Sequence, residues 1–378
     1  MRVAMLLRCL GMMRGGGETR HLAWARELTA LGVEVEIITG RPLFGEMRHP
    51  EAGATVIRSP YARGIVYRMQ GRRGFGRAGS LMLHSDEELF CRAAWRHIVS
   101  EPGRPDIVHA HALHQAARLR RENVPVVINL PGEPNSRYRD DLALADALVS
   151  DGWGARRLPE ILGRPVAHVT KGVNSELFRP DGPSQRSAMG LDGHPVVLCI
   201  SRLVPIKNVA LFVDAMARVH KSAPNARAVV VGDGPQHGEL QRRSADLGLG
   251  DVVRFAGYVP QEDLPRWYRA SDVFVLSSDF DNSPNVVLEA MATALPIVGT
   301  DVGGVSEFVD PRGGMLVPKG DAARMAAAIL EFVREPARRQ QAGAFNRQRA
   351  VTSFSWRRSA EQLLAVYQDA ISARRRAA

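Results

Sequence analysis

Hydrophobic positions follow two alternating periods along this chain. Short apolar runs predict buried strands, and the segments between them carry apolar residues at helical spacing. In the first half we expect strands at 2–8, 33–39, 54–58, 106–109, 125–130, 146–150 and 166–170. A helix over 18–31 joins the first two strands, so they form a parallel βαβ unit.

The same alternation starts again after a linker near 172–183. It predicts strands at 195–201, 226–232, 252–256, 272–276 and 296–300, and helices at 208–221, 236–247, 261–270 and 285–294. The fold class is therefore α/β, with two doubly wound, Rossmann-like domains facing each other across a cleft. We expect the domains at 1–175 and 176–353. An amphipathic helix over 354–372 could pack against either of them.

The first residues, the length of the apolar runs and the cysteines indicate where in the cell the protein works. We expect Met1–Leu7 to be a buried strand rather than a secretory signal, because Arg8 interrupts its apolar run. No apolar run reaches the 18 residues of a membrane span. The three cysteines (Cys9, Cys91 and Cys199) lack metal-ligand spacing, which fits a reducing cytoplasm.

Positive charge is concentrated in one part of the chain, whose formal net charge is +10. Residues 41–80 contain eight arginines and only two acids, and 62–80 have no clear periodicity, so we expect a mobile loop there followed by one helix. Such a stretch suits a phosphate-bearing acceptor, an acidic lipid surface or nucleic acid. Nucleic acid is least favoured, because few aromatic residues are interleaved. A genome rich in G and C, which would favour arginine over lysine throughout, is the open alternative, since only four lysines occur.

Two carboxylates, Asp281 and Glu289, flank the start of the predicted helix at 285–294. Ser283 fits an N-cap and Pro284 the first helical position. The first N–H groups of a helix have no partner within it, so this start can bind a phosphate while the acids bind sugar hydroxyls. Two solvated helix-start carboxylates are the alternative.

Two further motifs follow strands of the first half. The glycine triplet at 15–17 lets a ligand approach a helix start, but it lacks the spacing of a dinucleotide fingerprint, which disfavours a nicotinamide cofactor. His109 and His111 share one face of a strand. They could bind a metal, but no third ligand is evident, so His111 donating to a sugar hydroxyl is simpler. A tight turn and two structural histidines remain open alternatives.

In the second half, Arg202 and Lys207 lie in one loop and could converge on a diphosphate. Two solvated cations are the alternative. Gly232 and Gly234 form a turn that admits a nucleotide edge or is merely a turn. A glycine pair at 303–304, with Glu307 behind it, allows the same two interpretations.

Together these motifs resemble the retaining glycosyltransferases of the GT-B fold, family 4, over nearly the whole chain. The segments that carry the resemblance are Gly15–Glu18, Asp106–His111, Lys171–Pro180, Ser201–Lys207, Gly232–Pro235, Phe255–Val259, Ser283–Ala292 and Asp301–Glu307.

The resemblance implies a nucleotide-sugar donor, UDP- or GDP-linked, held mainly by the second domain without a cofactor or metal. Arg202 and Lys207 would hold the diphosphate, Glu289 the ribose, and Asp281 the sugar. His111 would contact the sugar near the reacting carbon. The other implied donor contacts are Gly16, Gly17, Gly232, Gly234, Tyr258, Val259, Ser283, Pro284, Asn285 and Val286. The last helix, within 354–378, would cross back onto the first domain.

Four positions depart from the family's pattern. Asp281 stands where the family usually has Glu, and its shorter side chain could shift the sugar contact or the choice of donor. Ser201 and Ala294 replace glycines, and Asn174 stands where Asp is common. None of these removes a charge that the diphosphate needs.

The expected reaction is metal-independent transfer of a sugar, with retention, to an acceptor hydroxyl. The acceptor would be phosphate-bearing, a lipid-linked glycan or another small molecule, and the protein cytoplasmic or peripheral at the inner face of the membrane. A nucleotide-sugar epimerase of the same fold and a non-catalytic protein that binds anionic ligands are the alternatives. The donor base, the sugar, the linkage and the acceptor stay open.

Overall fold

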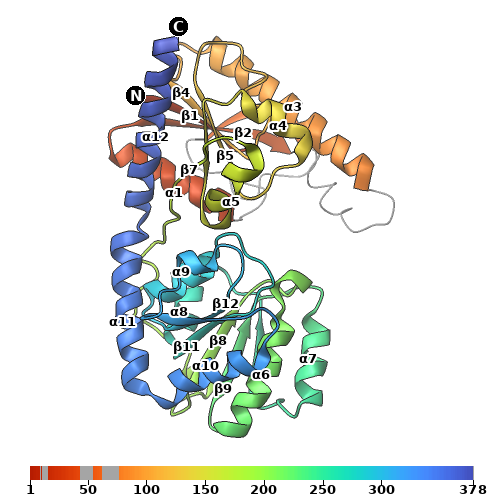
Figure 1. The fold of residues 1–378 in the computed structure, drawn as a ribbon, viewed down its shortest axis with the longest axis vertical. Helices are drawn as coiled ribbons and strands as arrows, with labels where there is room; N and C mark the ends of the chain where they lie inside the picture. Colours follow the sequence, from red (N-terminus) through yellow and green to blue (C-terminus); the bar gives the residue numbers. More distant parts are fainter. Residues whose placement is uncertain (9, 11–15, 43–53, 62–75, 378) are drawn as a thin grey trace. The chain divides into compact units, whose positions relative to one another are not determined.

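The computed structural model describes residues 1–8, 10, 16–42, 54–61 and 76–377. The chain divides into two compact units, which are coloured along the sequence in Figure 1. Unit 1 comprises Met1–Thr170 together with Trp356–Ala378, and unit 2 comprises Lys171–Ser355. The boundaries expected from the sequence, after 175 and after 353, lie within five residues of these.

Unit 1 contains a seven-stranded sheet in the order β3-β2-β1-β4-β5-β6-β7, in which all paired strands are parallel. The strands are β1 (Arg2–Leu6), β2 (Glu34–Pro42), β3 (Ala54–Tyr61), β4 (Ile107–His111), β5 (Val126–Asn129), β6 (Ala147–Ser150) and β7 (Ala167–His168). Because the strands are parallel, the loops at their carboxyl ends lie along one edge, where ligands bind in such sheets.

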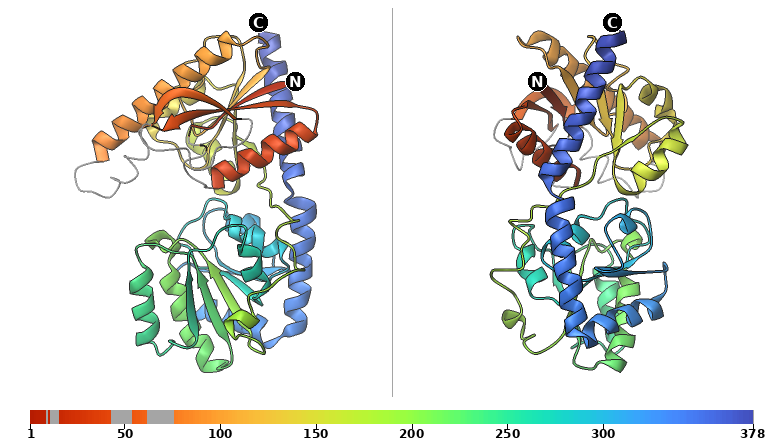
Figure 2. Two further views of the ribbon diagram at one scale, coloured as in Figure 1. Left: turned by 180° about the vertical axis from the view of Figure 1, so that it is seen from behind. Right: turned by 60° about the vertical axis from the view of Figure 1, so that its left-hand side comes forward.

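Helices cover both faces of this sheet, as the two views of Figure 2 show. Trp24 and Tyr367 bury one face under α1 (Gly16–Ala30) and α12 (Trp356–Ala377). Phe90 and Trp95 of α3 (Gly76–Ser100) cover the other face. The remaining helices in the described part of unit 1 are η1 (Ser136–Tyr138), α4 (Arg139–Ala143) and α5 (Gly152–Leu162). The last helix of the chain therefore belongs to unit 1.

Unit 2 contains a six-stranded parallel sheet in the order β10-β9-β8-β11-β12-β13. The strands are β8 (Val196–Ile200), β9 (Arg227–Val231), β10 (Val253–Gly257), β11 (Val273–Leu276), β12 (Ile297–Thr300) and β13 (Gly314–Val317). Its carboxyl ends also meet at one edge, which carries most of the motifs found in the sequence of this unit.

The helices of unit 2 form a layer on each face of the sheet. Leu211, Leu240 and Ile329 bury one face. They belong to α6 (Val209–Ser222), α7 (His237–Asp246) and α10 (Ala322–Arg334). Tyr268, Leu288 and Ala350 cover the other face. They belong to α8 (Leu264–Arg269), α9 (Asn285–Ala292) and α11 (Pro336–Ser353). The short helices are η2 (Ser187–Met189), η3 (Pro205–Lys207) and η4 (Val305–Glu307).

Apart from the three-residue helices, the pattern of apolar positions missed five elements of the described chain: α4, α5, β13, α10 and α11. Polar and small residues dominate α11, which contains few large apolar side chains to mark a helical period. The strand β13 has only four residues and begins with a glycine. Short or weakly amphipathic elements give little periodic signal, because tertiary packing rather than local sequence stabilises them.

Ala294 lies just after α9 in the left-handed region, with φ 61°. Its N–H bonds the carbonyl of Met291, and the next N–H bonds that of Ala290, as in a helix end that favours glycine. A side chain costs about 1–2 kcal/mol in this conformation. Ala294→Gly removes this cost but also raises the conformational entropy of the unfolded chain, which offsets part of the gain. The free energy of unfolding, measured by denaturant titration, should therefore rise by about 0.5–1 kcal/mol.

A matched control for this prediction is Ala327→Gly, at an exposed site inside α10. Ordinary helical geometry should make this change destabilising by about 1 kcal/mol. Equal losses of stability in both variants would show that position 294 is not strained.

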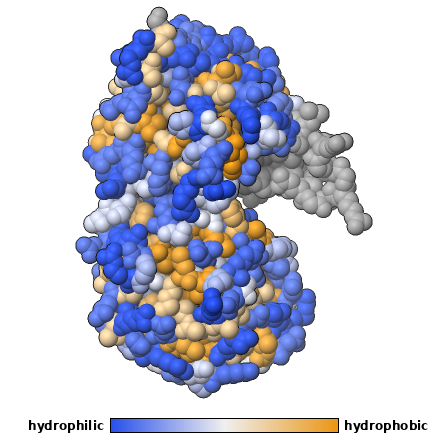
Figure 3. Space-filling view, viewed as in Figure 1, coloured by the Kyte–Doolittle hydropathy of each residue, from blue (hydrophilic) through white to orange (hydrophobic). Residues whose placement is uncertain are grey.

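The surface drawn in Figure 3 shows hydrophilic residues around separate hydrophobic areas. Among the described residues, no helix has the length and apolar character needed to cross a bilayer. The arginines of 41–80 fall outside the residues whose side chains the structure describes, so their role in binding anions stays a prediction.

Candidate functional site

Lys207 and Asp281, which are far apart in the sequence, meet at the carboxyl edge of unit 2. Lys207 Nζ lies 2.5 Å from Asp281 Oδ2, and both side chains are largely buried. Asn208 donates from Nδ2 to Asp279 at 2.8 Å, and Ser277 Oγ donates to the Lys207 carbonyl at 3.1 Å. These bonds tie the loop after β8 to the loop after β11. Two residues predicted to contact different parts of a ligand are thus each other's partners.

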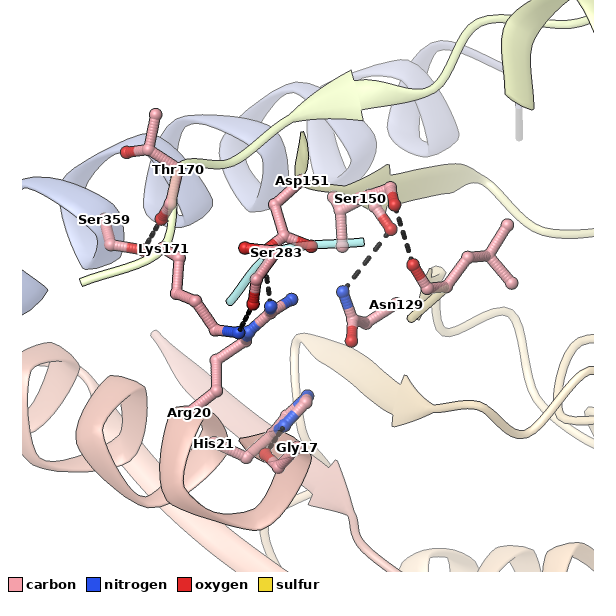
Figure 4. Close-up of polar contacts among 12 residues, drawn as sticks. Gly17, Arg20, His21, Asn129, Ser150, Asp151, Thr170, Lys171, Ser283 and Ser359 are labelled. Atoms are coloured by element: carbon pink, nitrogen blue, oxygen red, sulfur yellow. Dashed lines mark hydrogen bonds and ion pairs between the residues drawn. The ribbon is translucent and has the colours of Figure 1, made fainter. Parts of the chain in front are cut away.

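The helix α9 begins where the predicted range 285–294 does, but its N-cap differs from the prediction by one residue. The helix begins at Asn285, and Pro284 is the N-cap, because its ψ of 114° is extended. Ser283 is therefore not the N-cap, and its carbonyl accepts a hydrogen bond of 2.6 Å from Lys171 Nζ (Figure 4). Among the described residues, the buried Ser283 Oγ and Asn285 Oδ1 have no hydrogen-bond partner. Orphaned buried polar atoms at a helix start point to a polar ligand.

Glu289 lies one turn further along α9 and is buried. Its Oε2 accepts a hydrogen bond of 2.8 Å from the Tyr268 hydroxyl. Burial raises the pKa of Glu289 to about 7, although the Tyr268 bond and the charge of Lys171 oppose that shift. Glu289 therefore changes charge near neutral pH. Lys171 was not among the predicted site residues, and the only signal for it was its place in the segment Lys171–Pro180.

The other donor contacts expected in unit 2 vary in what surrounds them. A Cβ on Gly232 would lie 1.9 Å from the Ser201 carbonyl oxygen, and one on Gly234 would lie 2.4 Å from that of Leu203. Close backbone packing is thus a sufficient reason for both glycines. Arg202 is exposed, Tyr258 is 76% exposed, and Val259 is partly buried. Pro284, just before α9, is buried, and Val286, within the first turn of α9, is partly buried.

In unit 1, Gly17 and His111 are in close contact at the carboxyl edge. A Cβ on Gly17 would lie 2.4 Å from His111 Nε2, so a larger residue fits there only if the His111 ring moves, whereas Gly16 is exposed. His111 Nδ1 lies 3.0 Å from Asn129 Oδ1, and Asn129 Nδ2 donates to the Val149 carbonyl at 3.4 Å. Because Asn129 uses its Nδ2 to donate to Val149, its Oδ1 faces His111 and can only accept. His111 Nδ1 is therefore the donor in that bond. In the neutral ring Nε2 is then an acceptor, so a sugar hydroxyl would donate a hydrogen bond to His111, whereas the sequence led us to expect the opposite direction.

His109 does not share this environment. It is fully buried and bonds His21 and Tyr367, which matches the structural interpretation of this histidine. Across the described parts of the chain, no three His, Cys, Asp or Glu side chains gather as metal ligands. Independence from a metal remains a prediction.

Arg20 and Asp151 form a second buried ion pair in unit 1, which the sequence did not reveal. Arg20 Nη2 lies 2.5 Å from Asp151 Oδ2 (Figure 4), and its guanidinium lies 5.4 Å from the centre of the Trp24 ring. The available signal was that Arg20 and His21 fall on the same helical stripe as Trp24 and Leu28, where apolar residues are expected.

A pocket of about 400 Å³ lies in unit 1, along the loops after β1, β4 and β5. Its lining includes two arginines and two glutamates (Arg8, Arg137, Glu87 and Glu133), together with His114 and Tyr138. The last two rings stack with centroids 4.3 Å apart, and burial raises the pKa of Tyr138 to about 12. Cations beside carboxylates suit a ligand that carries both a phosphate and hydroxyls. No motif predicted this pocket.

Comparison with known proteins gives this geometry a context. The profile of the family described as "Glycosyl transferases group 1" matches residues 194–335. The D-inositol 3-phosphate glycosyltransferase of Acidothermus cellulolyticus is 32% identical over 322 residues, which cover 74% of this chain and 70% of that protein.

A second relative is the GDP-mannose-dependent alpha-(1-6)-phosphatidylinositol monomannoside mannosyltransferase of Mycolicibacterium smegmatis. It is 32% identical over 204 residues, and the match covers 51% of this chain and about half (53%) of that protein.

Among solved structures, the chain is similar to a sucrose-phosphate synthase from Thermosynechococcus elongatus. The TM-score is 0.77 at 21% identity, and the match covers 98% of this chain and 99% of the other. This likeness concerns the fold alone, and with the two parallel sheets it confirms the predicted GT-B architecture. The relative from Acidothermus cellulolyticus, together with the family profile, establishes that this chain belongs to the glycosyl transferases group 1 family and is a glycosyltransferase.

Proposed function

We propose that unit 2 binds a nucleoside-diphospho-sugar, and that the chain transfers its sugar, with retention, as in glycosyltransferase family 4. The observation that carries the proposal is the Lys207–Asp281 pair beside the orphaned polar atoms of Ser283 and Asn285. A diphosphate would replace Asp281 as the partner of Lys207. The released carboxylate would then accept hydroxyls of the sugar, so donor binding exchanges one ion pair for another.

The charges of this edge would also serve the reaction. Negative charge develops on the diphosphate as the bond to the sugar breaks. Lys207, Arg202 and the N–H groups at the start of α9 would stabilise it, which supplies counter-charge without a metal. The acceptor hydroxyl would attack from the face that the diphosphate leaves, and the departing phosphate oxygen would take its proton. Retention at the anomeric carbon follows from this shared face.

For the acceptor we propose a phosphorylated polyol bound in the pocket of unit 1. Arg8 and Arg137 would contact the phosphate, and Glu87 and Glu133 the hydroxyls. The names of both relatives support this choice, because they contain D-inositol 3-phosphate and phosphatidylinositol monomannoside. A free cyclitol phosphate and a phosphoinositol lipid present the same chemistry to the pocket.

The charge of Glu289 predicts how donor binding responds to pH. A carboxylate accepts the ribose hydroxyls, so binding favours the ionised form of a group whose pKa is about 7. Between pH 6 and pH 8, the affinity for GDP-mannose, measured by calorimetric titration, should rise about tenfold. Glu289→Gln should bind more weakly and lose this dependence. A variant that keeps the wild-type pH dependence would remove Glu289 from the donor site.

The proposed function is tested by transfer from GDP-mannose, UDP-glucose and UDP-N-acetylglucosamine to three acceptors. The acceptors are myo-inositol, an inositol phosphate and a phosphatidylinositol mannoside in vesicles. We expect a product whose anomeric configuration matches that of the donor, with the phosphorylated acceptors favoured. A preference for the vesicles would identify a lipid acceptor at the membrane, and a preference for inositol phosphate would identify a free one. Epimerised donor without acceptor, or binding without transfer, would favour the alternatives named above.

A further inference from the structure

Four groups from three elements of unit 1 form one continuous chain of hydrogen bonds. The Tyr367 hydroxyl of α12 lies 2.7 Å from His109 Nδ1 of β4. His109 Nε2 lies 3.1 Å from His21 Nε2 of α1, and His21 Nδ1 lies 2.7 Å from the Gly17 carbonyl oxygen. The three side chains are fully buried. The mechanism proposed above uses none of them.

The direction of every bond in this chain follows from its last member. A carbonyl oxygen can only accept, so His21 Nδ1 carries a proton and donates to Gly17. In the neutral ring His21 Nε2 then accepts, and His109 Nε2 must donate to it. His109 Nδ1 accepts in turn, which leaves the Tyr367 hydroxyl as the donor. The chain therefore runs one way, and it fixes a different tautomer on each histidine.

Both rings are held neutral, as this arrangement requires. Burial, reinforced by neighbouring positive charges, lowers the pKa of His109 to about 3. Burial also holds the pKa of His21 well below its ordinary value, and the neighbouring rings of His111 and His109 oppose a further positive charge there. The pattern of donors and acceptors is therefore stable at neutral pH.

This series of hydrogen bonds ends at Gly17, beside the candidate catalytic histidine His111. Gly17 leaves no room for a Cβ beneath His111 Nε2, and the His21 ring lies 4.3 Å, centre to centre, from that of His111. We infer that Tyr367 is a positioning residue: through His109 and His21 it holds Gly17 and the His111 ring in place. The inference rests on the proposed function only in giving His111 a role in the reaction.

Tyr367→Phe tests this inference. It removes the hydroxyl that donates to His109 Nδ1 in this series of hydrogen bonds, and it keeps the aromatic ring. Nitrogen-15 NMR of histidine-labelled protein should show protons on His21 Nδ1 and His109 Nε2 in the wild type. In the variant we expect mixed tautomers on both rings. We also expect kcat for sugar transfer to fall about tenfold, with KM for the donor unchanged.

Ser359→Ala is the matched control. Ser359 also links α12 to α1, but its hydrogen bond to α1 goes to Trp24 and not to a histidine. Ser359 Oγ accepts from Trp24 Nε1 at 2.7 Å, so its loss should affect stability but neither the tautomers nor kcat. His109→Gln, which keeps one acceptor and one donor, should retain more activity than His109→Leu. Wild-type tautomers in Tyr367→Phe, or an equal loss of kcat in Ser359→Ala, would overturn the inference.

The two proposals fail in distinguishable ways. If the wild-type protein transfers no sugar to any acceptor, the proposed function fails, while the NMR measurement still decides whether the chain of hydrogen bonds exists. If Tyr367→Phe does not fold, the comparison of His109→Gln with His109→Leu tests the same link by kcat and by the tautomer of His21.

Discussion

Replacing Lys207 by alanine is expected to lower kcat/KM for the donor by two to three orders of magnitude. Lys207 is the largely buried cation paired with Asp281, two residues before the orphaned Ser283, and removing one preorganised group of this kind costs about 10²- to 10³-fold. The variant also leaves Asp281 without its partner at 2.5 Å. That carboxylate would then repel the diphosphate, so both binding and turnover should suffer.

The double variant Lys207→Ala with Asp281→Asn separates these two causes. It removes the repelling carboxylate, so it should recover most of the lost stability and part of the donor affinity, but little of kcat. The loss of stability in the single variant should be about 1–3 kcal/mol, the cost of leaving a largely buried charge without its partner. Thermal unfolding and steady-state kinetics measure the two effects.

Lys319→Ala is the matched control for Lys207→Ala. Lys319 lies in the same unit, is 56% exposed and pairs with Asp279 at 3.7 Å, so its removal should change kcat/KM by less than about twofold. Wild-type turnover in Lys207→Ala would show that the diphosphate binds elsewhere and would remove the central support for the proposed donor site.

Gly17→Ala is expected to lower kcat at least about a hundredfold with only a small loss of stability. The new Cβ would lie 2.4 Å from His111 Nε2, so the histidine ring must move. A displacement of about 1 Å in a positioned catalytic group can cost about 10²-fold. The backbone itself should tolerate alanine, because Gly17 lies in the first turn of α1 with no positive φ to relieve. Steady-state kinetics of the variant test the expected fall in kcat, and thermal unfolding of the same preparation tests the small loss of stability.

Gly250→Ala is the control for an added methyl group, since nothing lies within 4 Å of a Cβ at that position. It should leave kcat unchanged. An active Gly17→Ala enzyme would mean either that His111 moves without cost or that it takes no part in the reaction.

Most of the architecture could be predicted from the sequence, because a buried strand and an amphipathic helix each leave a local period. The predicted strand at 226–232 and helix at 208–221, for example, differ from β9 and α6 by only one residue at each end. The N-cap of α9 was misplaced by one residue because serine and proline fit more than one position at a helix start. The extended ψ of Pro284 decided the matter.

The candidate site was predicted only where its residues follow strands. Lys207 and Asp281 were both predicted as candidates, but not their mutual ion pair, which joins positions 74 residues apart. Lys171, Arg20 and Asp151 were missed, because a buried polar residue reveals its role only through its partner. The pocket of unit 1 was missed for the same reason, since its lining comes from separate loops.

The sequence by itself determined the two sets of βα units, the loops that bear glycines and charges, and hence the family. These features depend on spacing along the chain, which local periodicity records. The tertiary structure alone decided which buried polar groups pair with each other. The bond between Tyr367 and His109 spans 258 positions, and no pattern of neighbours could indicate it. Burying a polar group is costly unless it finds a partner, and only the folded chain brings these partners together.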